Sequence, residues 1–80
     1  MKLRSIIVDD SSMQRMAVAK LVNNHPNLAL VAEYSNAIEA KNGIKNNEID
    51  LIFLDVEMPI ITGFDLLESL DNSPQVILIT

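Results

Sequence analysis

The stretch Leu51-Ile52-Phe53-Leu54-Asp55-Val56-Glu57-Met58-Pro59 decides the fold of this chain. Its first four residues are apolar, as in a strand that is buried on both faces of a parallel sheet. Asp55 follows this run directly, and the carboxyl ends of strands are where open α/β sheets bind ligands. A second apolar run, Ile6-Ile7-Val8, also ends in acidic residues, Asp9 and Asp10. The two runs predict an acidic site at one edge of one sheet.

The composition fits one small folded domain. The chain has 80 residues, of which 49% are hydrophobic, so we expect it to fold rather than remain disordered. It contains no cysteine, which excludes disulfides and thiolate metal sites and suits the cytoplasm. We find no signal peptide and no apolar stretch near the ~20 residues that cross a bilayer, so no membrane association is expected. The net charge of −5 argues against a basic nucleic-acid-binding patch in this segment.

Strand and helix patterns alternate along the chain, which indicates a parallel sheet. Apolar segments bounded by turn residues predict strands at 3–8, 28–34, 49–54 and 76–79. Helices are expected after the capping residues Ser11 and Asn36 and near Thr62. The first and third strands both carry acidic ends, so they should be neighbours. With right-handed crossovers, this predicts an α/β fold with a three-layer parallel sheet in the strand order 2-1-3-4.

The helices should cover the sheet with their apolar faces. In the first helix we expect Met13 and Met16 to face the sheet, because they follow helical spacing. In the second helix we expect residues 37, 40 and 44 to do so, and Gly43 should keep this helix short, because glycine costs about 1 kcal/mol relative to alanine there. His25 precedes a proline at a helix end, which favours a solvated residue over a catalytic one.

Three carboxylates, those of Asp9, Asp10 and Asp55, converge in this arrangement. Like charges at short range raise one another's pKa values unless a cation neutralises them. Mg²⁺ suits such a site, because it takes carboxylate, water and phosphate oxygens. One carboxylate is then free to attack phosphorus as a nucleophile. Helix capping remains an alternative for Asp9 and Asp10 taken alone, and it suits Asp55 less well.

Four ordered blocks of the chain resemble the receiver domain of bacterial two-component response regulators. The blocks are residues 6–10, 51–59, 62–64 and 76–80. The resemblance implies a flavodoxin-like fold and a signalling domain that is not itself an enzyme. Residues 34–40, together with 54–59, look most like receivers attached to LytTR-type DNA-binding domains, which implies an output in transcription regulation.

The resemblance also implies a role for each matching residue. Asp55 matches the phosphoacceptor, which takes its phosphoryl group from a histidine kinase and also contacts Mg²⁺. Asp10 matches the direct Mg²⁺ ligand, and Asp9 matches the acid that holds the ion through water. The backbone carbonyl of Glu57 matches the third protein ligand. Thr80 matches the hydroxyl that bonds the phosphoryl group and couples it to a conformational switch.

Complete receivers continue beyond the position of Thr80 with further strand–helix units, which carry a lysine that pairs with the acceptor. We therefore expect residues 1–80 to be the N-terminal portion of a receiver in a longer regulator; a naturally short protein is the alternative. The strand at 76–79 is then an apolar sheet edge, and such edges pair with other chains. Self-association through residues 76–80 is the corresponding expectation.

Two other functions remain open from the sequence. The missing lysine favours an interaction module that keeps the fold but does not use phosphate. The spacing of Glu57, two residues after Asp55, is that of a general acid in phosphatases with an aspartate nucleophile. The acidic pair Asp9-Asp10 and the sequence Met58-Pro59 fit a receiver better than a phosphatase.

Overall fold

The structure, a computed structural model, describes residues 2–46, 48–55 and 74–79. Its strands and helices are β1 (Leu3–Val8), α1 (Ser12–Asn23), β2 (Leu28–Tyr34), α2 (Ala37–Asn46), β3 (Leu51–Asp55) and β4 (Gln75–Ile79). The helix expected near Thr62, and the predicted site residues Glu57 and Thr80, lie outside the described residues.

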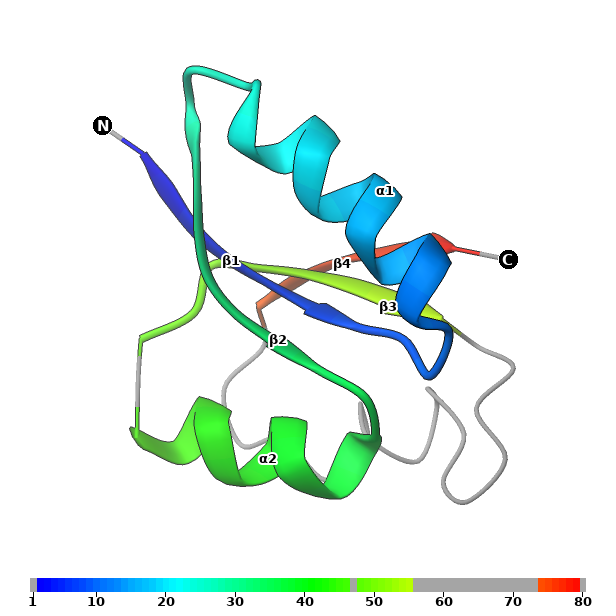
Figure 1. Cartoon of the computed structure of the whole chain (residues 1–80). Helices are drawn as coiled ribbons and strands as arrows, with labels where there is room; N and C mark the ends of the chain where they lie inside the picture. The colour runs from blue at the N-terminus through cyan, green and yellow to red at the C-terminus, as the bar shows by residue number, and fades with distance from the viewer. Residues whose placement is uncertain (1, 47, 56–73, 80) are drawn as a thin grey trace.

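The described strands form one sheet in the order β2-β1-β3-β4, and each of its pairings is parallel. Helix α1 covers one face of the sheet and α2 lies on the opposite face (Figure 1). The sheet is therefore the middle layer of three. The predicted α/β fold and the strand order 2-1-3-4 are both confirmed.

Strands β1 and β3 contribute buried side chains to both faces of the sheet. On the α2 face, Ile6, Val8, Ile52 and Leu54 pack with Ala37 and Ala40. On the α1 face, Ile7 packs with Val18 and Val22, and Phe53 and Ile79 lie against them. Burial on both faces explains why residues 6–8 of β1 and 51–54 of β3 are uninterrupted apolar runs and do not alternate with polar residues.

Helix α1 begins where the sequence predicts but presents a different face to the sheet. Ser11 is its N-cap, and the Ser11 Oγ accepts a hydrogen bond from the backbone N–H of Gln14 at 3.3 Å. Met13 and Met16, expected to face the sheet, are instead 82% and 71% exposed. That prediction is wrong, because Val18 and Val22 occupy the face that contacts the sheet.

Helix α2 is capped as predicted and packs on the sheet through the expected residues. The Asn36 Oδ1 accepts the backbone N–H of Glu39 at 2.9 Å, and the expected sheet-facing residues 37, 40 and 44 pack on the core. The helix ends at Asn46 after 10 residues, so it is short, as predicted. A Cβ added at Gly43 would overlap the Tyr34 hydroxyl and ring. Glycine thus lets β2 and α2 approach each other.

The pairing of strand β2 with β1 contains an irregularity that the sequence does not predict. Its register with β1 shifts between Ser5, which lies opposite Leu30, and Ile6, which lies opposite Ala32. Such a bulge leaves one residue unpaired and reverses the faces of the residues that follow. As a result Tyr34 lies on the α2 face beside Val8, and Glu33 lies level with Ile7 on the α1 face.

The last two strands differ slightly from their predicted bounds. Strand β3 begins at Leu51 rather than at residue 49, and it includes Asp55, which is paired with Ile79. Asp50 precedes the strand and binds Arg4 of β1. Its N–H donates to the Arg4 carbonyl at 2.8 Å, and its Oδ2 accepts the Arg4 N–H at 2.9 Å. Strand β4 begins one residue early, at Gln75.

Two smaller expectations concern features remote from the sheet edge. His25 is exposed, as predicted, and its Nδ1 accepts the N–H of Asn27 at 3.1 Å. Neither helix in the described part of the chain has the length and apolar character needed to cross a membrane.

Candidate metal centre

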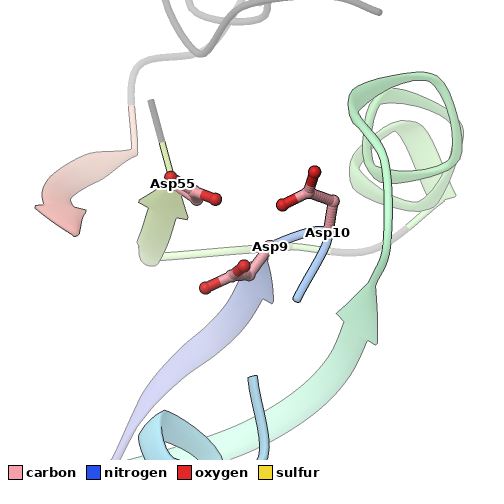
Figure 2. Close-up of side chains that lie close together, drawn as sticks. All are labelled: Asp9, Asp10 and Asp55. Atoms are coloured by element: carbon pink, nitrogen blue, oxygen red, sulfur yellow. The ribbon is translucent and has the colours of Figure 1, made fainter. Parts of the chain in front are cut away.

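The parallel register of β1 and β3 brings the predicted acidic residues together. Val8 lies opposite Leu54, so the next residues, Asp9 and Asp55, leave the two strands at the same level. Asp10 follows in the loop before α1, and Figure 2 shows the three side chains gathered at this edge. Each offers a carboxylate oxygen, and these oxygens all lie within 4.8 Å of one another. The predicted convergence is confirmed.

The three carboxylates differ in their exposure to solvent. Asp9 is fully buried and Asp55 is 5% exposed, whereas Asp10 is exposed. Buried carboxylates that are close together are costly unless they are paired or coordinate a metal. The exposed Asp10 marks the side on which the site is open to solvent.

Asp9 is held by hydrogen bonds with three other residues. Its N–H donates to the Tyr34 carbonyl at 3.0 Å, and its carbonyl accepts from the Arg15 Nη1 at 2.7 Å. Its Oδ1 accepts the backbone N–H of Ser11 at 2.9 Å. Its other oxygen, Oδ2, is buried and has no hydrogen-bond partner in the described part of the chain. One carboxylate oxygen thus remains available at a site where the rest of the residue is fixed.

The surroundings of Asp9 disfavour its charged form. Burial raises the pKa of the Asp9 carboxyl above its ordinary value, and the nearby carboxylates of Asp55 and Asp10 raise it further. The hydrogen bond from the Ser11 N–H opposes these effects. In the absence of a cation, the site therefore holds negative charge at a cost in free energy.

These observations fit a hard divalent cation. The buried Oδ2 of Asp9 lacks a hydrogen-bond partner among the described residues, and a hydrated cation would both give it a partner, through a bound water, and neutralise the clustered charge. Oxygen ligands from one or two carboxylates, completed by water, are what Mg²⁺ prefers. Capping does not account for Asp9, because the N-cap of α1 is Ser11.

Two neighbours of the site were not predicted from the sequence, Arg15 and Tyr34. Both reach Asp9 through its backbone. The sequence contains no motif that would have identified Tyr34. Arg15 lies six residues after Asp9 along the chain, but its proximity depends on the rotation of α1 about its axis, which the spacing of Met13 and Met16 predicted wrongly.

The fold and the acidic edge define a class of protein: a flavodoxin-like α/β domain with a carboxylate cluster where the first and third strands end. The sequence model of the response regulator receiver domain matches residues 6–80. The chain therefore belongs to the family of response regulator receiver domains, which act in two-component signalling.

Individual relatives agree with this assignment. A protein-glutamate methylesterase/protein-glutamine glutaminase 2 of Bordetella avium is 41% identical over 69 residues, which is 86% of this chain but 20% of that protein. A related methylesterase/glutaminase of Yersinia pestis is 38% identical, with the same coverage. This chain thus spans about a fifth of the length of these curated relatives.

Solved structures show the same fold. The response regulator domain of Thermotoga maritima CheB superposes with a TM-score of 0.86 at 28% identity, covering 98% of this chain and 60% of that one. A chain from the complex of the CheA3 P1 domain with CheY6 of R. sphaeroides gives a TM-score of 0.83 at 30% identity, covering 95% of this chain and 61% of that one. The predicted relation to LytTR-type receivers is not tested by these comparisons and stays a prediction.

Proposed function

We propose that this chain accepts a phosphoryl group on Asp55 and thereby switches an attached or partner output. The observation that carries the proposal is the convergence of Asp55 with Asp9 and Asp10 at the carboxyl edge of the sheet. In a receiver fold this edge presents a nucleophilic carboxylate beside a pair of acids able to hold a cation.

In the proposed reaction, a carboxylate oxygen of Asp55 attacks the phosphorus of a phosphohistidine on a kinase. The oxygen–phosphorus bond forms while the nitrogen–phosphorus bond breaks, its electron pair returns to the imidazole, and that nitrogen takes up a proton. The product is an acyl phosphate on Asp55. The burial of Asp55 limits the access of water to this carboxylate.

Mg²⁺ is the proposed cofactor, and when bound it neutralises charge on the phosphoryl oxygens. Asp10 and Asp55 would hold it directly, Asp9 through water, and the backbone carbonyl of Glu57 would complete the protein ligands. Thr80 would contact the phosphoryl group through its hydroxyl. Glu57 and Thr80 enter through the family resemblance alone, since both lie outside the described residues.

The proposed partners are a histidine kinase, which donates the phosphoryl group, and an output domain. The similarity to a chain from the CheA3–CheY6 complex supports a kinase partner, and the cytoplasm is the proposed location. The methylesterase relatives support an enzymatic output, whereas the LytTR resemblance supports DNA binding and transcription regulation. We further propose self-association through residues 76–80, because β4 is the outermost strand of the sheet that the described residues form and it exposes Ile77 and Leu78.

Beryllofluoride, which mimics an aspartyl phosphate, tests the proposal. Binding measured by calorimetry should require Mg²⁺ and should be lost in Asp55→Asn. Asp50→Asn is the matched control: it makes the same change at the amino end of β3 and should bind beryllofluoride normally. Binding that persists in Asp55→Asn would refute the assignment of the acceptor. Absence of binding in the parent protein would favour a phosphate-independent interaction module. Steady turnover of a phosphate ester would favour the phosphatase alternative.

A further inference from the structure

Arg15 makes two contacts that join the acidic site to strand β2. Its Nη1 donates to the carbonyl of Asp9 at 2.7 Å, and its Nε lies 3.8 Å from the Oε1 of Glu33. The Arg15 side chain is only 23% exposed. A planar guanidinium can hold two acceptors at once in a fixed geometry, which the single ammonium of lysine cannot do.

The carbonyl that Arg15 binds has a special place in the site. It belongs to the peptide unit between Asp9 and Asp10, and a peptide unit is planar and rigid. Its orientation therefore influences the directions in which both acidic side chains leave the backbone. The preceding peptide is fixed separately, because the Asp9 N–H donates to the Tyr34 carbonyl at 3.0 Å.

Glu33 is within reach of Arg15 only because of the bulge in β2. The register shift after Ser5 places Glu33 level with Ile7, on the face of the sheet that α1 covers. In a regular strand Glu33 would point to the opposite face. The bulge thus supplies a carboxylate that orients the guanidinium from the side of β2.

We propose that Arg15 is a positioning residue of the metal centre: by binding the Asp9 carbonyl while paired with Glu33, it sets the relative placement of Asp9 and Asp10. The inference rests on the proposed function, since it assigns Arg15 to the Mg²⁺ site. Arg15 acts through the backbone and makes no contact with the cation or the phosphoryl group.

The substitution Arg15→Lys tests the proposal, because it keeps the positive charge and removes the planar guanidinium. We expect the dissociation constant for Mg²⁺, measured by calorimetric titration with MgCl₂, to rise about tenfold, the lower end of the range for residues that orient metal ligands. Arg4→Lys is the matched control: Arg4 binds the Glu48 carbonyl at 2.8 Å near the opposite edge of the sheet, and its replacement should leave Mg²⁺ affinity unchanged.

Glu33→Gln provides a second comparison. The pair between Arg15 and Glu33 is an ion pair at 3.8 Å, so glutamine removes the attraction while keeping the size of the side chain, and Mg²⁺ affinity should fall by less than in Arg15→Lys. In the double variant Arg15→Lys, Glu33→Gln, the lysine no longer has a charged partner in Glu33 and is free to donate to the Asp9 carbonyl. Partial recovery of Mg²⁺ affinity in the double variant is therefore expected, and a purely structural role for Arg15 would not produce it.

The outcomes separate this inference from the proposed function. If the parent protein does not bind Mg²⁺, both are overturned. If the parent binds Mg²⁺ and Arg15→Lys binds it equally well, only the role of Arg15 is overturned. A measurement on the parent alone covers the case of an unfolded variant: MgCl₂ should shift the Arg15 Nε–H resonance in NMR spectra with the same midpoint as the Asp10 amide. An unshifted Arg15 resonance would overturn the proposal.

Discussion

Replacing Asp9 by asparagine should stabilise the protein when no cation is present. Asparagine keeps an oxygen that can accept the Ser11 N–H, now at 2.9 Å, and it removes a buried charge. The oxygens of Asp9 and Asp55 lie within 4.8 Å, where two unit charges repel by about 3.5 kcal/mol at an effective dielectric constant of about 20. Water reaches the site on the side of the exposed Asp10 and weakens this repulsion. We therefore expect the free energy of unfolding to rise by about 1–2 kcal/mol, which is part of the repulsion energy.

The effect should depend on pH with a definite sign. The pKa of Asp9 is raised in the folded protein, chiefly by burial, so the folded protein binds this proton more tightly than the unfolded chain does. The contribution of Asp9 to stability is thus greatest below the ordinary carboxyl pKa and is lost as pH rises through the raised value. Asp9→Asn lacks this loss, so its advantage over the parent should grow from acid to neutral pH.

Urea unfolding followed by circular dichroism, with a chelator present, measures the difference. Saturating Mg²⁺ should then reverse the order, since a ligand at 100 times its dissociation constant stabilises by about 2.7 kcal/mol and the variant has lost an acid of the site. Asp50→Asn is the control: it makes the same charge change and retains an acceptor for the Arg4 N–H. The reasoning is refuted if Asp9→Asn is the less stable protein at neutral pH without cation, or if Mg²⁺ stabilises both proteins equally.

Further predictions concern packing and the sheet edge. Gly43→Ala should lower the free energy of unfolding by about 1–3 kcal/mol, because the new methyl overlaps the Tyr34 ring. In a Tyr34→Ala background the same substitution should instead raise the free energy of unfolding by about 1 kcal/mol, because alanine has the higher helix propensity. In urea titrations, Val22→Ala, at a buried position, should cost about 2 kcal/mol, whereas Leu21→Ala, at an exposed one, should cost less than about 0.5 kcal/mol. Ile77→Lys on the exposed β4 should weaken self-association in sedimentation velocity, and a parent protein that is monomeric at all concentrations would contradict that prediction.

Local signals were sufficient for most of the strands, the helix starts and the acidic cluster. Apolar runs identified β1 and β3, and the acids at their ends indicated which strands are neighbours. The caps Ser11 and Asn36 act within a few residues of their own positions, so no tertiary information was needed to predict them. The roles assigned to Glu57 and Thr80 rest on the family resemblance and stay predictions.

Only the tertiary structure decided which face of α1 packs on the sheet. This helix carries apolar residues around much of its circumference, so its spacing does not select one face. The methionines fit one phase and Val18 with Val22 fit another, and contact with Ile7 on the sheet selects the valines. The role of Gly43 was decided in the same way, because the absence of a side chain there matters through Tyr34, a residue on another element.

The sequence by itself determined that Asp9, Asp10 and Asp55 meet, because parallel strands deliver the residues after them to one edge. The structure decided how Asp9 is held there. The bulge in β2 turns Glu33 toward α1 and Tyr34 toward α2, and Arg15 then binds the Asp9 carbonyl. The placement of Glu33 and Tyr34 depends on a one-residue shift in register between β1 and β2, and the pattern of apolar residues in β2 is compatible with either register. The physical reason is that the alternation of polar and apolar residues along a strand specifies which residues face the core only when the two faces of the strand differ in polarity.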